Sequence, residues 1–221
     1  MIAAGGQIQG ARRRQEDAWH VERYGDDELL AIIADGLGGH PAGDVASREA
    51  VREFVEQVTE RRRRGTQSPR QWLQDSTIAT DACLQDMARK KRALREMATT
   101  LVALYLRGNS FWAVSVGDSY LLLLRDGQLV RLNELHAEGG GVTSCVGFNL
   151  SRVDIADELP AAPGDRFLLA TDGVITLDDA EVSAFLGGPK DASTAVHDLL
   201  GAVEHAGSPG QDNATVVAIL L

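Results

Sequence analysis

The sequence predicts an α+β fold in which helices pack on antiparallel sheets. Short strand-like runs open the chain, and two long amphipathic segments follow between residues 41 and 97. The second half returns to short strand-like runs separated by hairpin turns, with two further helical segments before the last strand. Strands grouped apart from helices are typical of helices laid on sheets.

Three strands are expected before the first helix. We place them at residues 7–10, 17–24 and 28–34, with a turn at residues 25–27. From Leu29 onward the third run is apolar at every position, which is typical of a strand buried on both faces.

Two long helices follow and are expected to form a helical hairpin on a sheet. The first is predicted from residue 41 to about residue 63, and the arginines at 61–64 favour its C-terminal end through the helix dipole. The second has Ser68 as N-cap and Pro69 in its first turn, and it is predicted to reach about residue 97.

The second half is predicted to begin as an antiparallel meander. Hairpin signals stand at residues 107–109 and 125–127. The loop at residues 133–149, with three glycines in its middle, is expected to be irregular and mobile. We place the remaining strands at 99–107, 111–116, 120–125, 128–132, 151–155, 165–171 and 214–221, and the helices at 178–186 and 192–204, the latter capped by Asp191.

Acidic residues stand at the ends of five of these strands. They are Glu16 and Asp17, Asp35, Asp118, Asp172 and Asp212. One Asp-Gly pair after a strand is commonly no more than a turn. If all five ends converge, however, the like charges need compensation, and divalent cations are the simplest source of it. Ligands that are all oxygen suit Mg²⁺ or Mn²⁺ better than Zn²⁺.

Composition narrows the classes of partner. The chain has 221 residues, which fits a single domain over residues 1–221, and its net charge of −10 disfavours nucleic acid and anionic membranes. Cys83 and Cys145 lack metal-ligand spacing. Residues 1–7 have no basic region, and no apolar run approaches the ~18 residues of a membrane span. We therefore expect a cytoplasmic monomer.

Six short motifs follow one another along almost the whole chain. They are Arg12-x-x-x-Glu16-Asp17, Ala34-Asp35-Gly36-Leu37-Gly38-Gly39-His40, Ala98-Thr99-Thr100, Val116-Gly117-Asp118-Ser119, Ala170-Thr171-Asp172-Gly173 and Asp212-Asn213-Ala214-Thr215. In this order they resemble the metal-dependent protein phosphatases, the PPM or protein phosphatase 2C family, in its bacterial form. The resemblance implies a four-layer α/β/β/α sandwich with a dinuclear metal site between its sheets.

The resemblance also implies a role for each site residue. Asp35 would bridge two Mn²⁺ or Mg²⁺ ions that activate a water for hydrolysis of phosphoserine or phosphothreonine. Arg12 would bind the phosphate, and His40 is a looser match to a general acid. The other metal ligands would be Glu16, the Gly36 carbonyl, Asp172 and Asp212, with Asp17 beside them and Asp118 on a weaker third ion.

The sequence departs from the family pattern in two informative places. Tyr120 stands where many members have Arg, and residues 133–149 are too few for the usual flap, so we expect an open face and weak binding of the third ion. The expected partner is a phosphorylated protein opposed by a Ser/Thr kinase. A regulatory binding module with low activity stays an alternative, and a two-metal nuclease or other phosphoesterase fits the motif order less well.

Overall fold

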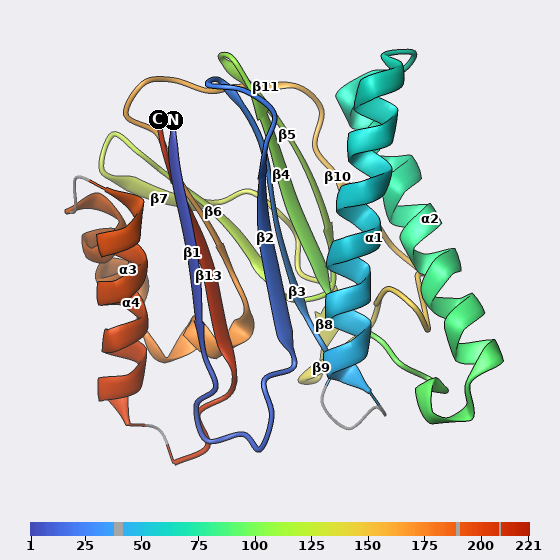
Figure 1. The fold of residues 1–221 in the computed structure, drawn as a ribbon. Helices are drawn as coiled ribbons and strands as arrows, with labels where there is room; N and C mark the ends of the chain where they lie inside the picture. The colour runs from blue at the N-terminus through green and yellow to red at the C-terminus, as the bar shows by residue number, and fades with distance from the viewer. Residues whose placement is uncertain (38–41, 189–190, 208) are drawn as a thin grey trace.

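Two antiparallel sheets lie face to face in the middle of the molecule, and a pair of helices covers the outer face of each (Figure 1). The structure is a computed structural model that describes residues 1–37, 42–188, 191–207 and 209–221. Apolar side chains fill the space between the sheets and the space under each helix pair. The predicted α+β class and the four-layer α/β/β/α sandwich are confirmed.

The first sheet has, within the described residues, five strands in the order β1-β13-β12-β6-β7. Each neighbouring pair is antiparallel. Its outer face carries α3 (Asp179–Gly187) and α4 (Ala192–Ala206), and Asp191 caps α4 as predicted. The strands are β1 (Ile2–Ile8), β6 (Tyr120–Arg125), β7 (Gln128–Arg131), β12 (Arg166–Ala170) and β13 (Ala214–Leu220).

The second sheet follows the order β10-β5-β4-β3-β2, with β11 paired to β5 outside this path. Its outer face carries the predicted helical hairpin, α1 (Gly43–Arg64) and α2 (Pro69–Lys90). Ser68 caps α2 in a capping box with Gln71. The strands are β2 (Asp17–Arg23), β3 (Glu28–Asp35), β4 (Leu101–Arg107), β5 (Ser110–Val116), β10 (Asp154–Ile155) and β11 (Leu159–Pro160).

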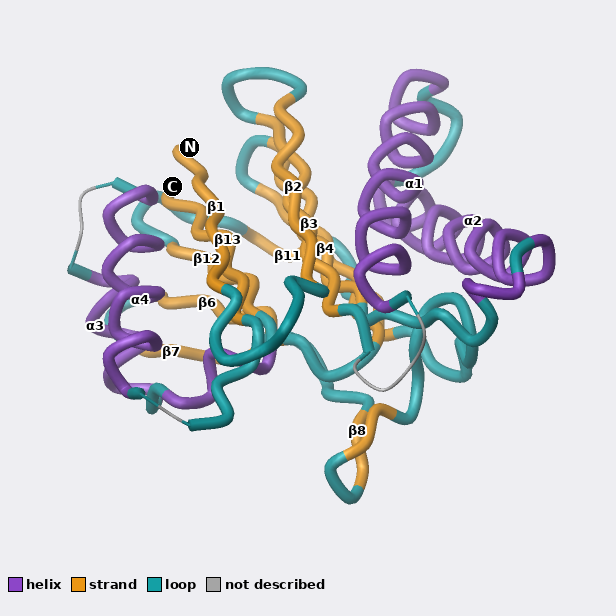
Figure 2. Tube along the Cα trace, turned by 60° about the horizontal axis from the view of Figure 1, so that its bottom comes forward, coloured by secondary structure: helices purple, strands orange, loops and turns teal. Residues whose placement is uncertain are grey.

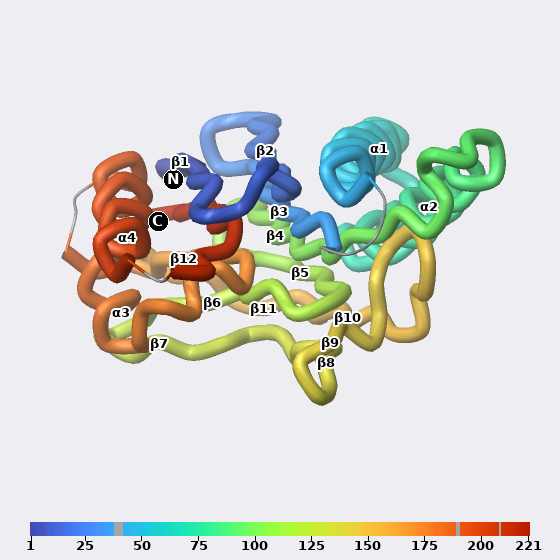
Figure 3. The backbone as a smooth tube through the Cα atoms, turned by 90° about the horizontal axis from the view of Figure 1, so that it is seen from below, coloured from blue at the N-terminus to red at the C-terminus, as the bar shows by residue number. Residues whose placement is uncertain are grey.

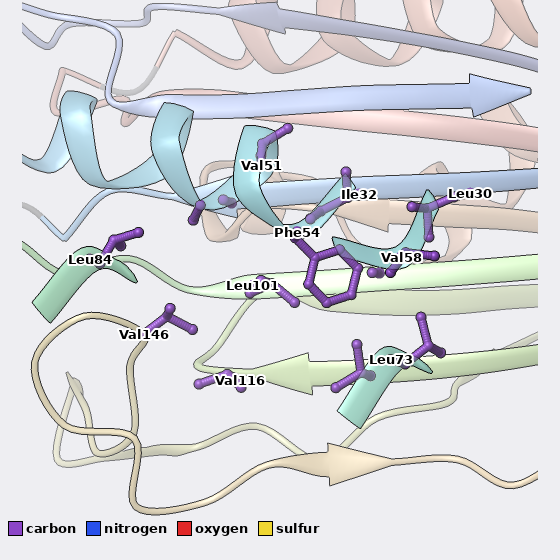
Figure 4. Packing of buried hydrophobic residues seen from close by; sticks show 14 of the residues in the cluster. Leu30, Ile32, Val51, Phe54, Val58, Leu73, Leu84, Leu101, Val116 and Val146 are labelled. Carbon is purple, nitrogen blue, oxygen red and sulfur yellow. The ribbon is translucent and has the colours of Figure 1, made fainter. Parts of the chain in front are cut away.

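Strand β3 is buried on both faces, as its unbroken apolar run predicts. Ile33 faces the first sheet, whereas Leu30 and Ile32 face the helices and lie near Phe54 and Val58 of α1 (Figure 4). All five side chains have no exposed surface. Complete burial of such side chains contributes roughly 1.5–3 kcal/mol each, so β3 anchors both layers against which it packs.

The first strand is where the predicted limits are most wrong. Strand β1 covers Ile2–Ile8 rather than residues 7–10, because it pairs with β13 along its whole length. Its small residues, Ala3 to Gly6, carry no apolar alternation that would mark a strand. Helix α2 ends at Lys90 rather than near residue 97, and the short helix η1 (Arg92–Leu94) follows it. The other predicted helices and strands begin and end within a few residues of the observed ones.

The loop at residues 133–149 is more ordered than its glycines suggest. It contains a short hairpin, β8 (Ala137–Glu138) and β9 (Gly141–Val142), which projects from the sandwich (Figure 2). The end of the loop is held by Val146, which exchanges backbone hydrogen bonds of 2.9 and 3.1 Å with Thr99. The expectation of irregular structure is therefore wrong for these segments, whereas mobility of the hairpin stays a prediction.

Candidate metal centre and active site

The acidic strand ends meet at one end of the sandwich. Strands β1, β3, β5 and β12 finish there, and β2 and β13 begin there (Figure 1 and Figure 3). Asp35 lies directly opposite Asp17 in the sheet register. Burial raises the pKa of Asp35 well above its usual range, and the charges of Asp17, Asp172, Asp118 and Asp212 add to the effect. We call these five carboxylates the acidic cluster.

Asp17 joins the two sheets at the base of the acidic cluster. Its Oδ2 accepts hydrogen bonds from the hydroxyls of Thr171 (3.0 Å) and Thr215 (2.7 Å), which belong to the opposite sheet. Its Oδ1 is buried without a hydrogen-bond partner. Burial raises the pKa of Asp17 to about 6, although the two hydroxyls act in the other direction. A buried carboxylate oxygen without a donor is costly, and a cation would compensate it.

Asp35 and Gly36 form a corner that is held through the backbone. The Asp35 carbonyl accepts bonds from the Thr99 hydroxyl and the Thr100 amide, both 2.8 Å, and the Asp35 amide donates to the Thr100 hydroxyl at 2.9 Å. A Cβ on Gly36 would lie 2.2 Å from the Gly43 carbonyl oxygen, at the start of α1. Only glycine fits there, because backbone occupies the space on that side.

Asp172 and Gly173 form a matching corner on the other sheet, at the start of the short helix η2 (Asp172–Thr176). A Cβ on Gly173 would lie 1.9 Å from the Asn213 carbonyl oxygen. Asp172 Oδ1 is buried without a hydrogen-bond partner. Burial, followed by the charges of Asp118, Asp212 and Asp17, raises the pKa of Asp172 to about 6. Each sheet thus presents an Asp-Gly corner with its carboxylate in the acidic cluster.

The rim of the site carries the predicted phosphate ligand. The Arg12 guanidinium lies 2.5 Å from Asp212 Oδ2, and the two side chains are 51% and 36% exposed. The Asn213 side chain organises the loop that bears Arg12, since it accepts from the Glu16 amide and donates to the carbonyls of Gln9 and Arg14. No local pattern assigned this role to Asn213 beforehand.

Glu16 also lies on the rim, close to a carboxylate that the sequence did not single out. Burial raises the pKa of Glu16, and the charge of Asp44, in the first turn of α1, adds to the effect. The Glu16 carbonyl accepts hydrogen bonds from the Gly36 amide (3.0 Å) and the Ser47 hydroxyl (2.5 Å). The chain at Glu16 is therefore fixed against both the Asp35 corner and α1.

Asp118 lies in a turn that residues from the shortened loop hold in place. The Gly117 amide donates to His136 Nδ1 (3.3 Å), and the His136 amide donates to the Gly117 carbonyl (2.8 Å). On the far side of Asp118, the Ser119 carbonyl accepts from Asn133 at 2.9 Å. Neither His136 nor Asn133 was among the predicted site residues. Burial raises the pKa of Asp118.

Comparison with known proteins assigns the chain to a family. The family model described as protein phosphatase 2C matches residues 7–215. The chain belongs to the protein phosphatase 2C family. The resemblance drawn from the six motifs is therefore confirmed.

Relatives within the protein phosphatase 2C family span almost the whole chain. The serine/threonine phosphatase stp of Listeria innocua serovar 6a is 27% identical over 230 residues, which cover 94% of this chain and 90% of that protein. The solved structure of the Mycobacterium tuberculosis serine/threonine phosphatase PstP/Ppp has a TM-score of 0.82 at 25% identity and covers 99% and 97% of the two chains. PppA of Pseudomonas aeruginosa has a TM-score of 0.80 at 28% identity and covers 99% and 96%.

Protein phosphatases 2C depend on metal ions, and the acidic cluster has the chemistry to hold them. Within residues 1–37, 42–188, 191–207 and 209–221, no group of three or more His, Cys, Asp or Glu side chains is already placed to hold a metal ion. The buried oxygens of Asp17 and Asp172 without donors nevertheless fit hard divalent cations, which take oxygen ligands. Such ions would offset the burial and the mutual repulsion that raise the pKa values of Asp17 and Asp172.

His40, the looser match to a general acid, lies outside the described residues.

Among the described residues, no helix is long and apolar enough to span a membrane.

Proposed function

We propose that this chain is a metal-dependent serine/threonine protein phosphatase that hydrolyses phosphoserine and phosphothreonine esters with an activated water. Membership of the protein phosphatase 2C family supports this function. The single observation that carries it is the acidic cluster, in which carboxylates from both sheets meet at one end of the sandwich, where burial first and mutual repulsion second raise their pKa values.

In this proposal the cluster holds two Mn²⁺ or Mg²⁺ ions. Asp35 would be a ligand of both ions, Asp172 and Asp212 would be ligands of one, and Glu16 and the Gly36 carbonyl would be ligands of the other. Asp17 would lie beside them, and Asp118 would hold a weaker third ion. When bound, the ions activate a water and neutralise charge on the phosphoryl oxygens.

The remaining chemistry is positioning, which phosphoryl transfer mainly requires. The Arg12 guanidinium presents a planar fork of donors that matches two phosphate oxygens. It already faces a carboxylate oxygen of Asp212 at 2.5 Å, so a phosphate arriving at the ions would meet it at the rim. His40 is proposed as the acid that protonates the leaving serine or threonine oxygen.

The proposed substrate is a phosphorylated protein whose modification a Ser/Thr kinase installs. A role in bacterial signalling is supported by the described role of PppA, a key regulatory component of T6SS in Pseudomonas aeruginosa. We propose that the chain acts as a cytoplasmic monomer formed by a single catalytic domain over residues 1–221.

Hydrolysis of p-nitrophenyl phosphate and of a phosphoserine peptide, with EDTA and with Mn²⁺, tests the function. We expect activity to be lost with EDTA and restored by Mn²⁺ or Mg²⁺. Asp35→Asn should lower kcat by about 10³-fold, whereas the matched change Asp26→Asn, in the exposed turn before β3, should not. Full activity in EDTA, or wild-type kcat in Asp35→Asn, would overturn the proposal, and an inactive wild type with Mn²⁺ would favour a regulatory binding module.

A further inference from the structure

A hollow of about 210 Å³ opens on the first sheet, near the acidic cluster. Its walls come from β6, β7 and β12 on one side and from η2 and α3 on the other. Most of the lining is apolar, including Leu122, Leu129 and Val182. The exposed side chains of Arg131 and Asp179 also line it, one from β7 and the other from α3. We call this hollow the side pocket.

The side pocket adjoins the site through a shared residue. A separate hollow of about 220 Å³ is lined by Asp172 and Asp212, two members of the acidic cluster. Ile175 lines both hollows and is 62% exposed, which is unusual for an isoleucine. Helix η2 starts with Asp172 and carries Ile175 one turn later, so a single short element links the carboxylates to the side pocket.

Tyr120 connects the two regions along the chain. It lines the side pocket and lies two residues after Asp118. The start of β6 therefore links the turn that carries Asp118 to the wall of the side pocket.

We propose that the side pocket is a substrate subsite that takes one aliphatic or aromatic side chain of the phosphoprotein, near the phosphorylated residue. The proposal rests on the proposed phosphatase function. Its occupant follows from this adjacency: the chain next to a phosphoserine held at the acidic cluster would cross Ile175 and reach the apolar side pocket. The rim charges of Arg131 and Asp179 would face the polar backbone of that chain, and the apolar lining would face its side chain.

Phosphoserine peptides that differ at one flanking position test the subsite. Each position is compared as Leu, Phe, Glu or Lys, and kcat/KM is measured for each peptide. At one position we expect kcat/KM for the Leu or Phe peptide to exceed that for the Glu peptide by about tenfold. The reason is that an apolar side chain is transferred out of water into the side pocket. Ile175→Glu should reduce this ratio to near one. Leu129→Gln is a second variant with the same expected direction.

Val130→Glu is the matched control, because Val130 is 50% exposed in β7 and does not line the side pocket. It should keep the preference for the apolar peptide. A ratio near one at every position in the wild type would overturn the subsite, as would an unchanged ratio in Ile175→Glu and Leu129→Gln. Self-association that Ile175→Glu abolishes, without a peptide preference, would assign the surface to a second copy instead.

The assays distinguish the phosphatase function from the subsite. If the wild type with Mn²⁺ hydrolyses neither p-nitrophenyl phosphate nor any phosphopeptide, the phosphatase function itself is wrong. If it hydrolyses them all with equal kcat/KM, the function stands and the subsite is wrong.

Discussion

The base and the rim of the acidic cluster are built in opposite ways. At the base, Asp17 is 5% exposed and fixed by hydroxyls from the opposite sheet. At the rim, Arg12 and Asp212 meet on the surface, with 51% and 36% of their side chains exposed. The base is therefore held in a fixed geometry in which the carboxylates repel one another. The exposed ion pair at the rim contributes only about 0–1 kcal/mol, so its two side chains can exchange partners easily.

This difference suggests that the base binds cations and the rim binds phosphate. Charges at the base lower the stability of the metal-free protein and are expected to gain most from cations. Charges at the rim are weakly committed to each other, so Arg12 is free to transfer to a phosphate while Asp212 turns to an ion. Variants at the two levels should differ in both the size and the kind of their effects.

We count Asp172 with Asp17 at the base, because each has a buried carboxylate oxygen without a hydrogen-bond partner. The largest effect is expected there, from Asp172→Ala. Its Oδ1 is buried without a hydrogen-bond partner, so its removal deletes a proposed metal ligand while relieving repulsion within the cluster. We expect kcat to fall by about 10³-fold and the melting temperature of the EDTA-treated protein to rise. Enzyme assays and calorimetry measure these two quantities. Wild-type kcat would contradict the assignment, and a lower melting temperature would contradict the account of repulsion.

The pH dependence of stability separates the base from the rim without a change in sequence. The pKa values of Asp17 and Asp172 are raised from 3.8 to about 6, so the folded chain binds these protons more tightly than the unfolded chain. The free energy of unfolding of the EDTA-treated protein should therefore fall as pH rises from about 4 to above 6, by roughly 3 kcal/mol for Asp17. Urea titrations at several pH values measure it.

Two controls sharpen that experiment. Asp172→Asn should flatten the pH dependence, and saturating Mn²⁺ should remove most of it, because a cation compensates the charges that the protons would otherwise neutralise. If the wild type and Asp172→Asn showed the same pH dependence from pH 4 to 7 in EDTA, burial and repulsion would not raise the pKa of Asp172.

The sequence predicted the base and the rim to different degrees. Repeated Asp-Gly pairs after apolar runs made the corners at Asp35 and Asp172 predictable, because the pattern is local. The threonines that hold Asp17 were not predictable as such, since Thr171 and Asp17 are 154 residues apart in sequence and no local pattern records their contact. Strand β1 was misplaced for the same reason, because its pairing with β13 joins the two ends of the chain.

A smaller effect is expected at the rim, from Arg12→Ala. Phosphate is bound in both the ground state and the transition state, so KM should rise by about tenfold and kcat should change less. Steady-state kinetics with a phosphopeptide separate the two parameters. The exposed neighbours Arg13 and Arg14 serve as matched controls, and each alanine variant should be nearly silent. If Arg13→Ala proved the sensitive one, the motif would be out of register by one residue.

The smallest effect concerns the turn that carries Asp118. His136 is 2% exposed, and burial lowers its pKa, which keeps the ring neutral and leaves Nδ1 able to accept from the Gly117 amide. In His136→Leu that buried amide loses its partner, which costs about 1–3 kcal/mol locally and loosens the turn.

The measurement is the Mn²⁺ concentration that gives half-maximal activity. Looser placement of Asp118 should raise it about threefold in His136→Leu, less than the roughly 10–100-fold typical of residues bonded to a metal ligand, because His136 contacts the Gly117 backbone and not the Asp118 carboxylate. In His136→Asn the side-chain oxygen can take the place of Nδ1, so this variant should restore the wild-type value. Leu and Asn variants that titrate alike would show that His136 only fills space. A midpoint that moves in neither His136→Leu nor Asp118→Ala would remove the third ion from the mechanism, and the shortened loop would then contribute nothing to metal binding.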